Sequence, residues 1–288
     1  MDGAIESANP LAGVRLAFVG AGVMAEAMIA GLLARKLVAP AQVAGSHPRP
    51  VRREELTGKY GIEVFESNRE AAEFARAGDG ASGGIVILSV KPQKLVGVVR
   101  ELKDSVAADA LVVSIVAGAR VETIAGELLH PSVVRVMPNT PAQVGEGMTV
   151  WTATPQVTGE QAAQVRAMLG ALGREMRVDE ERQIDMATAL SATGPTYVFL
   201  VMEALIDAGV HMGFSREVAR ELVIQTMLGS VLFARESHKH PAELRNMVTS
   251  PGGTSAEAIY QMEKGSLRTV MSKAVYAAFQ RAVALGKK

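Results

Sequence analysis

The feature that most constrains the fold is a short apolar run followed by three small residues at fixed spacing. Leu16–Val19 is the apolar run, Gly20 and Gly22 follow directly, and Ala25 stands three residues later in an Ala- and Met-rich stretch. This G-x-G-x-x-A pattern, between a predicted strand and a predicted helix, is typical of folds that bind dinucleotides. The first glycine allows the tight turn, the second lets a pyrophosphate approach the backbone, and the helix N-terminus attracts its negative charge. An ordinary tight turn is the alternative, and the strand–helix context favours the cofactor site.

Short apolar runs alternate with helical segments over residues 13–178, which predicts a parallel sheet with helices on both faces. The expected strands after the first are 43–45, 62–64, 85–89, 111–115, 133–137, 148–152 and 175–178. A helix at 158–171 is expected between the last two. The turn-rich sequence DGASGG at 79–84 predicts a loop tip. We therefore expect a flexible lead at 1–12 and an α/β Rossmann domain at 13–178.

The chain after residue 178 contains helical patterns and no predicted strand, so residues 179–288 are expected to form an all-α domain. The segment Tyr197–Leu205 is apolar nearly all round, interrupted only by Glu203, which predicts a buried helix. Residues 267–285 carry apolar side chains at helical spacing. A helical domain of this size is too thin to bury so much apolar surface in one copy. We expect homodimerisation through this half.

Composition excludes several classes of protein. The chain has 30 basic and 30 acidic residues, and this zero net charge argues against a nucleic-acid or membrane-surface partner. It has no cysteine, so disulfides and thiol catalysis are excluded. The N-terminus lacks a signal-peptide pattern and no apolar run approaches a membrane span, so a cytoplasmic protein is expected. No metal site is expected, because no metal-ligand spacing occurs among His47, His130, His211, His238 and His240.

The segment after the second expected strand indicates which dinucleotide is preferred. An Asp or Glu at that position would bind the ribose 2′-hydroxyl of NAD and repel a 2′-phosphate. Here Ser46, His47 and Arg49 occupy it, followed by Arg52 and Arg53. A hydroxyl and several cations suit a 2′-phosphate through charge-assisted hydrogen bonds. The sequence therefore predicts NADPH, with NADH possible but less preferred; a solvated basic loop is the alternative.

Three further polar segments end predicted strands. SVKP (Ser89–Pro92) and SIVAG (Ser114–Gly118) end two of them, and Asn139 lies in the turn RVMPNTPA after another. Ligands in open α/β sheets bind at the carboxyl ends of the strands, so the first two segments are expected to line the cofactor crevice and Asn139 to lie near the substrate. The alternatives are a surface lysine at Lys91 and a rigid turn at a domain boundary.

The segment MVTSPGGTSAEAI in the helical half has the features of an anion-binding loop. Gly252 and Gly253 free the backbone directly before a predicted helix, whose first N–H groups point outward. A small carboxylate is expected to bind the amides of Gly253, Thr254 and Ser255 and the hydroxyl of Ser250. An ordinary helix–helix loop with a Ser or Thr cap is the alternative.

Together these motifs resemble those of the pyrroline-5-carboxylate reductases. The resemblance runs from FVGAGVMAEAMIAGL through SVKPQ, VVSIVAGA, RVMPNTPA and ALSATGPTYVF to VTSPGGTSAEAI, which is the family's most specific segment. It implies a Rossmann domain, a helical domain that interlocks with a partner's, and often rings of dimers. It also implies that NAD(P)H reduces the C=N bond of a cyclic imino acid to give L-proline, the last step of proline biosynthesis.

The resemblance also implies roles for individual residues. The substrate carboxylate would be held by Ser250, Gly252, Gly253 and Thr254, and the hydroxyl of Ser255, where the family usually has threonine, would face the ring nitrogen. The candidate cofactor contacts are Gly20, Ala21, Gly22, Val23, Met24, Ser46, His47, Arg49, Asn68, Ser89, Val90, Lys91, Pro92, Ala117 and Gly118.

This reaction needs few polar residues in the helical half. A protonated imine is already electrophilic, so the protein must mainly position the nicotinamide and the carboxylate. One alternative is another NADP-linked imine reductase or a β-hydroxyacid dehydrogenase of the same plan, which would require an acid–base group such as lysine in 181–212. The other is a non-enzymatic NADPH sensor, and the intact SPGGTS loop argues against it.

Overall fold

The computed structural model describes residues 9–76 and 83–286. The chain divides into two compact units, which we describe separately. The first comprises residues up to Thr193 together with the chain from Ala278 onward, and the second is Gly194–Ala277. The segment between residue 178 and Thr193, expected in the helical half, thus packs with the sheet.

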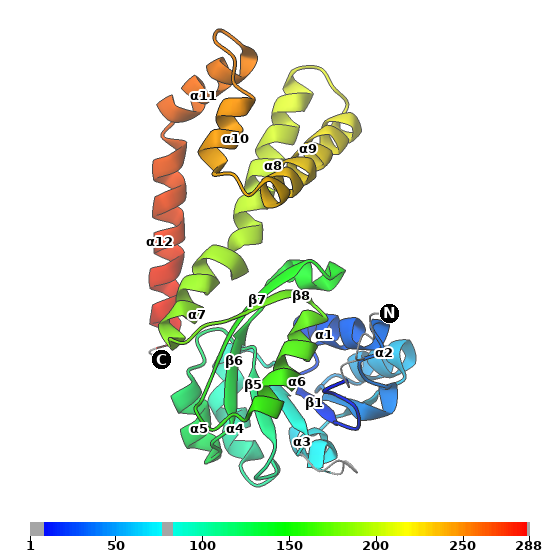
Figure 1. The fold of residues 1–288 in the computed structure, drawn as a ribbon. Coiled ribbons are helices and arrows are strands. Elements are labelled where there is room, and N and C mark those ends of the chain that lie inside the picture. The colour runs from blue at the N-terminus through cyan, green and yellow to red at the C-terminus, as the bar shows by residue number, and fades with distance from the viewer. Residues whose placement is uncertain (1–8, 77–82, 287–288) are drawn as a thin grey trace, which may run out of the picture. The chain divides into compact units, whose positions relative to one another are not determined.

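A sheet of eight strands forms the centre of the first unit (Figure 1). The strands are β1 (Leu16–Val19), β2 (Val43–Ser46), β3 (Glu63–Phe65), β4 (Ile85–Leu88), β5 (Leu111–Ser114), β6 (Val133–Met137), β7 (Gly147–Ala153) and β8 (Gly173–Arg177). Their order is β3-β2-β1-β4-β5-β6-β7-β8. β1 to β6 are parallel, which confirms the expected Rossmann architecture.

The last two strands depart from the expected parallel arrangement. β7 runs antiparallel to β6, and β8 runs parallel to β7. Only nine residues separate β6 from β7, and they contain one short helix, η3 (Thr140–Val144). A parallel crossover needs a dozen or more residues, so this connection can only reverse the chain.

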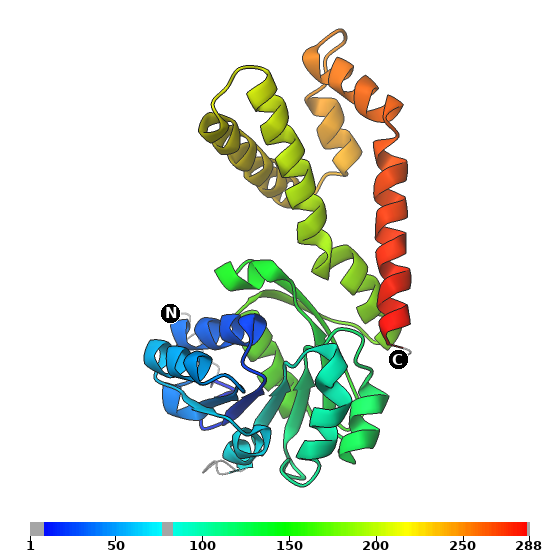
Figure 2. The same ribbon diagram turned by 180° about the vertical axis from the view of Figure 1, so that it is seen from behind.

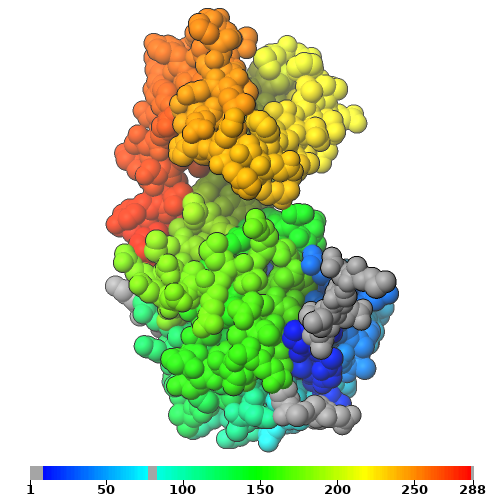
Figure 3. All heavy atoms as spheres, viewed as in Figure 1, coloured from blue at the N-terminus to red at the C-terminus, as the bar shows by residue number. Residues whose placement is uncertain are grey.

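Helices cover both faces of the sheet because successive strand residues point to opposite sides. Leu16 and Phe18 of β1 pack in one core cluster, while Ala17 and Val19 pack in the other. The first cluster includes residues of α1 (Val23–Ala34), α2 (Pro50–Tyr60) and α6 (Gly159–Gly170). The second includes residues of α3 (Asn68–Arg76), α4 (Leu95–Leu102) and α5 (Val121–Leu128). Figure 2 shows α4 and α5 side by side, and Figure 1 shows α6 on the opposite face of the sheet, where green atoms cover the front of the first unit in Figure 3.

The segment after β8 returns to the sheet as a helix with an irregular end. α7 (Glu181–Ala187) continues into η4 (Thr188–Ala192), a π-helical turn. Ile184 of α7 is fully buried against Met137 and Val150, from β6 and β7. α7 is therefore a layer on the end of the sheet.

The second unit consists of helices, as expected. They are α8 (Gly194–His211), α9 (Arg216–Ser237), α10 (Pro241–Met247), α11 (Thr254–Lys264) and the first part of α12 (Leu267–Leu285). α8 and α9 pack against each other in both views (Figures 1 and 2).

The expected burial of Tyr197–Leu205 is wrong for a single chain. Phe199 is 59% exposed and Leu200 66% exposed, and Gly209 is the one buried residue of α8. The sequence expectation about membrane spans also needs correction, because the helical stretch Glu181–His211 is long and apolar enough to cross a membrane by length and composition alone. An apolar helix that its own chain leaves exposed is equally consistent with a contact surface that a second copy of the chain covers.

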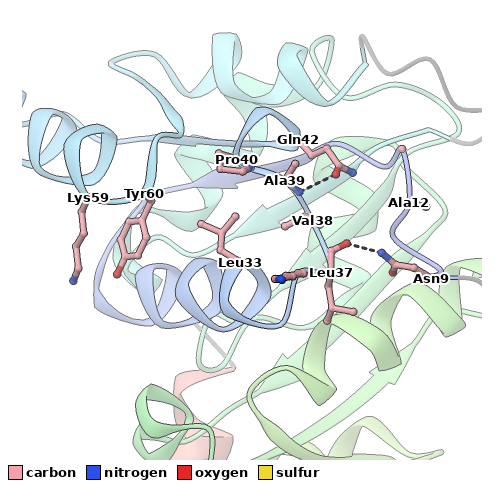
Figure 4. A pocket seen from close by; sticks show the side chains of 12 residues that line it. Asn9, Ala12, Leu33, Leu37, Val38, Ala39, Pro40, Gln42, Lys59 and Tyr60 are labelled. Atoms are coloured by element: carbon pink, nitrogen blue, oxygen red, sulfur yellow. Dashed lines mark hydrogen bonds between the residues drawn. The ribbon is translucent and has the colours of Figure 1, made fainter.

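The N-terminal lead expected at 1–12 is ordered where the structure describes it. Leu11 is fully buried, and the Asn9 side chain donates a hydrogen bond of 2.8 Å to the carbonyl of Leu37 (Figure 4). Figure 4 also shows the side chain of Gln42 turned toward the Ala39 N–H, from which it accepts a bond of 2.9 Å. The expected flexible lead is thus wrong for residues 9–12, because Leu11 completes the core. Positions 79–82 of the expected loop tip lie outside the described residues.

Candidate functional site

The turn after β1 requires glycine at its first position. Gly20 has φ +90°, and a Cβ there would lie 2.7 Å from Cγ1 of Val90. Ala21 is buried, and Gly22 is the N-cap of α1 and provides no side-chain cap. Val23, which opens the helix, is 66% exposed. The start of α1, where Met24 also lies, is therefore free to receive an anion, as the sequence predicts.

Ser46 holds this turn in place. Its hydroxyl accepts a hydrogen bond of 3.0 Å from the Gly20 N–H and donates one of 2.8 Å to Oδ1 of Asn68. Asn68, the first residue of α3, donates in turn to Glu101 at 3.1 Å. Ser46 is fully buried, so its hydroxyl serves the protein itself. The structure brings these candidate residues together around Gly20.

The end of β4 contributes a second support. The Ser89 hydroxyl lies 3.1 Å from the carbonyl oxygen of Val19 and 3.0 Å from that of Gly20, and its one hydrogen is shared between them. Val90 closes over Gly20, whereas Lys91 and Pro92 are exposed. Four candidate cofactor contacts thus lie at the carboxyl end of one strand, beside the glycine turn.

Most cations of the basic segment are already paired. Arg52 forms ion pairs with Glu26 and Glu55, and Arg53 pairs with Glu66 at 3.0 Å. Among the described residues, Arg49 has no ion-pair partner, and it is exposed. Arg49 is therefore the cation of this segment that remains available to a ligand.

Glu26, in the first turn of α1, is hydrogen-bonded to several side chains of α2. It accepts hydrogen bonds from Lys59 at 2.8 Å and Tyr60 at 2.9 Å, as well as from Arg52. The hydrogen bond from Lys59, followed by that from Arg52, lowers the pKa of Glu26 from 4.5 to about 2. In the nearby loop, burial and the charge of Arg49 lower the pKa of His47. Glu26 is thus ionised at neutral pH and fastens α2 to α1.

In the loop after β5, which contains Ala117 and Gly118, the backbone lies close to the end of α12. Gly118 has φ +74°, and a Cβ there would lie 3.0 Å from Leu285, at the end of α12. A cavity of about 550 Å³ borders this loop, and its lining includes Pro92, Ala117 and Gly118. Three predicted cofactor residues therefore face one hollow of the first unit.

Asn139 holds the turn after β6. Its Oδ1 accepts a hydrogen bond of 2.9 Å from the Met148 N–H, and its Nδ2 lies 3.4 Å from both oxygens of Ser191 in η4. Both ends of the amide thus have partners within the protein. Its proposed nearness to the substrate stays a prediction.

A buried ion-pair network beside this turn escaped the sequence analysis. Arg135 of β6 is 1% exposed and donates to Glu181 at 3.0 Å and to Asp185 at 2.6 Å. Oε1 of Glu181, which accepts from Arg135, also accepts a hydrogen bond of 2.9 Å from the N–H of Val121. An arginine inside the apolar strand VVRVM was the available signal, because a buried charge requires a partner.

The loop before α11 is described within the second unit. Gly252 has φ +71°, and Gly253 is the N-cap of α11, so no Ser or Thr side chain caps this helix. A Cβ on Gly253 would lie 2.5 Å from the Ser250 hydroxyl oxygen. The hydroxyls of Thr254 and Ser255 have no hydrogen-bond partner among the described residues. Free hydroxyls and N–H groups thus converge at a helix N-terminus, an arrangement that suits a carboxylate.

No cluster of three or more His, Asp or Glu side chains that could hold a metal ion occurs within residues 9–76 and 83–286.

Comparison with known proteins gives matches over nearly the whole chain. A family model for pyrroline-5-carboxylate reductase dimerisation matches residues 181–285, and one for coenzyme F420-dependent NADP oxidoreductases matches residues 15–118. A pyrroline-5-carboxylate reductase of Pseudomonas aeruginosa is 40% identical over 95% of this chain and 97% of its own length. One from Synechocystis is 38% identical over 96% of this chain and 99% of its own.

Solved structures agree with these sequence matches. A Plasmodium falciparum pyrroline carboxylate reductase with NADP bound superposes with a TM-score of 0.84 at 31% identity, covering 95% of this chain and 98% of that one. A Coxiella burnetii pyrroline-5-carboxylate reductase also gives 0.84, at 35% identity, covering 96% and 100%.

Proposed function

The chain belongs to the pyrroline-5-carboxylate reductase family, and we infer from this membership the roles of its own residues in the family reaction. The enzyme catalyses the NAD(P)H-dependent reduction of pyrroline-5-carboxylate to L-proline. Similarity over nearly the full length of curated relatives carries this conclusion. Oxidation of NADPH, followed by its absorbance with pyrroline-5-carboxylate as substrate, tests it. A folded protein that binds NADPH but turns over no pyrroline-5-carboxylate would overturn it.

The cofactor is proposed to bind at the start of α1. The residues fit it, since Gly22 leaves the helix N-terminus uncapped and Gly20 has no room for a side chain. The N–H groups of Val23 and Met24 would bind the pyrophosphate, while Ser46 and Ser89 keep the turn rigid. When bound, the nicotinamide supplies the hydride.

The preference for NADPH is proposed to depend on Arg49. The Ser46 hydroxyl already bonds to Gly20 and Asn68, and Arg52 and Arg53 have carboxylate partners. Arg49 is exposed and has no ion-pair partner among the described residues. It would bind the 2′-phosphate by charge-assisted hydrogen bonds, with His47 beside it.

The substrate carboxylate is proposed to bind at the loop before α11. The N–H groups of Thr254 and Ser255 precede the first intrahelical bonds, and Gly253 leaves the approach open. The Ser250 hydroxyl lies against Gly253 and would give a further bond. This arrangement fixes one end of the imino acid, so the imine carbon can be held at a defined position.

The Ser255 hydroxyl is proposed to face the ring nitrogen of the substrate. The ring imine enters protonated, and hydride addition at carbon leaves that proton on the amine of proline. A strong general acid is therefore unnecessary, and a hydroxyl that orients the N–H group suffices. Ser255 is partly buried and its hydroxyl has no bond within the described protein, which supports this role.

The chain self-associates through its dimerisation domain and acts on a small molecule. The exposed apolar side chains of α8, among them Phe199 and Leu200, support a homodimer formed through this helix. A ring of dimers, a cytoplasmic location and the lack of a nucleic-acid or membrane partner stay predictions. Light scattering of the purified protein measures its oligomeric state and so tests the ring of dimers.

A further inference from the structure

Arg135 occupies a position where a charge is costly. It lies on an interior strand, its guanidinium is 1% exposed, and its Nε is buried without a partner. Removing a charged group from water costs several kcal/mol, and apolar residues of similar volume often replace buried ion pairs without loss of stability. Stability alone is therefore a weak reason for this arginine.

The partners of Arg135 connect it to two parts of the candidate site. Glu181 and Asp185 stand four residues apart on α7, so both carboxylates lie on one helix face and accept from Arg135 at 3.0 Å and 2.6 Å. The same oxygen of Glu181 accepts the N–H of Val121 at 2.9 Å. Val121 is the first residue of α5 and directly follows the loop at residues 115–120, which we call the cofactor loop. Glu181 thus caps a helix to which it is not joined in sequence.

Packing extends the same connection. Ile184, between the two carboxylate residues of α7, is fully buried in a cluster that includes Ala117 of the cofactor loop and Ala192 of η4. Ser191, the neighbour of Ala192, lies 3.4 Å from Nδ2 of Asn139. A shift of α7 would therefore move the cofactor loop and the turn that bears Asn139 together. A π-helical turn such as η4 is often found at functional sites.

We propose that Arg135 is a positioning residue for cofactor binding: through Glu181 and Asp185 it fixes α7, and α7 holds the cofactor loop at Ala117 and Gly118. The guanidinium has a fixed planar fork, so two carboxylates one turn apart are held in one geometry. This inference rests on the proposed function, because it takes Ala117 and Gly118 as cofactor contacts. It adds a residue that touches neither substrate nor cofactor.

The first test replaces Arg135→Lys in the full-length chain and measures the Kd for NADPH by calorimetry, together with kcat, KM and Tm. Lysine keeps the charge but cannot bond both carboxylates in the same fork. We expect the Kd and KM for NADPH to rise, by roughly 3- to 100-fold, because small displacements of positioning groups have effects of this size. Arg100→Lys is the matched control, since Arg100 pairs with Glu127 between exposed faces of α4 and α5. We expect it to leave the Kd unchanged.

The second test compares Glu181→Ala with Glu181→Gln and remains available if the Arg135 variant does not fold. Glu181 is 23% exposed, so its loss is easier to tolerate. Glutamine keeps an oxygen that can accept from Val121 and Arg135, whereas alanine keeps none. We expect Glu181→Ala to weaken NADPH binding and Glu181→Gln to restore most of it. A merely structural role would lower Tm in these variants and leave the Kd of the folded protein unchanged.

The outcomes separate this inference from the proposed function. Wild-type protein that binds NADPH but reduces no pyrroline-5-carboxylate contradicts the proposed function, and the Kd measurements still decide the role of Arg135. Wild-type Kd values in folded Arg135→Lys and Glu181→Ala proteins would overturn the positioning role, even if the enzyme is fully active. Increased Kd values in both, with Arg100→Lys unchanged, would support it.

Discussion

The hydroxyl of Ser46 accepts a hydrogen bond of 3.0 Å from the N–H of Gly20 and is fully buried. This bond joins the end of β2 to the glycine turn after β1. The side chain that the sequence suggested for the cofactor 2′-phosphate is therefore used to hold the turn at which we propose that the pyrophosphate binds. We therefore propose that the exposed residues that follow Ser46, and Arg49 first among them, select between NADPH and NADH.

Arg49→Gln should lower kcat/KM for NADPH and leave that for NADH nearly unchanged. A hydrogen bond to a charged group is worth about 1.5–3 kcal/mol, so loss of one phosphate contact should cost roughly 10-fold or more. NADH lacks the 2′-phosphate and serves as the internal control. Steady-state kinetics with both cofactors, for wild type and variant, measure the effect. Equal kcat/KM values for NADPH and NADH in the wild type would contradict the predicted preference.

Ser46→Ala should affect both cofactors alike. Alanine leaves the Gly20 N–H and Asn68 without their hydroxyl partner, which should cost about 1–3 kcal/mol of stability. The turn would then be less well fixed for either dinucleotide, so the Kd values of NADPH and NADH should rise by similar factors. Calorimetry and thermal melts check this. A rise in Kd confined to NADPH would instead indicate that the Ser46 hydroxyl contacts the 2′-phosphate directly.

Ser255→Ala should lower kcat/KM for pyrroline-5-carboxylate without lowering Tm. A neutral hydrogen bond is worth about 0.5–1.5 kcal/mol and one to a charged group about twice that, so the loss should be roughly 3- to 100-fold. Tm should be unchanged because Gly253, and not Ser255, is the N-cap of α11. Ser255→Thr should keep activity or raise it slightly, since its branched side chain restricts the hydroxyl rotamer.

Ser215→Ala is the matched control for Ser255→Ala. Ser215 is the N-cap of α9, and its hydroxyl accepts from the Val218 N–H at 3.2 Å. Its replacement should cost about 1 kcal/mol of stability and leave kcat/KM unchanged. Unchanged kinetics with a lowered Tm in Ser255→Ala would show that this hydroxyl, too, is structural.

A chain truncated after Thr193 should be more stable than one truncated after Val178. The shorter chain lacks Glu181 and Asp185 and would leave Arg135 as an unpaired buried charge, at a cost of about 3–5 kcal/mol. Both truncated chains lack α8 to α12, so both should be monomeric and without reductase activity. Thermal melts and light scattering measure the difference. Equal melting temperatures would show that α7 contributes nothing to the stability of the first unit.

Glu26→Gln should flatten the dependence of stability on pH at the acidic end. The pKa of Glu26 is lowered from 4.5 to about 2 in the folded protein, so the carboxylate stabilises the fold fully above pH 4.5. That contribution is lost as the pH falls toward 2. Glutamine cannot titrate, so the variant should be less stable at neutral pH and lose less on acidification. Urea unfolding at several pH values measures both effects, and parallel pH curves would contradict this account.

The sequence by itself determined the order of elements and predicted where the cofactor site begins. The alternation of Leu16–Val19 with later apolar runs specified the Rossmann half, because periodicity reports which residues are buried. Gly20 identified the turn, since few other residues fit a positive φ and a close approach of the neighbouring strand end. The SPGGTS loop was likewise recognisable from local chemistry, and the structure adds that Gly253 forms its cap.

Tertiary structure alone decided which polar groups meet. The sequence predicted Ser46 as a cofactor contact, but the direction of its hydroxyl depends on Gly20, 26 residues away. Arg135 bonds to residues 46 and 50 positions further along the chain, and no local pattern specifies those pairs. The reversal of β7 depends likewise on the length of one connection. Local propensity and burial leave a periodic trace in a sequence, whereas a hydrogen bond between distant side chains exists only after packing has brought its two atoms within about 3 Å.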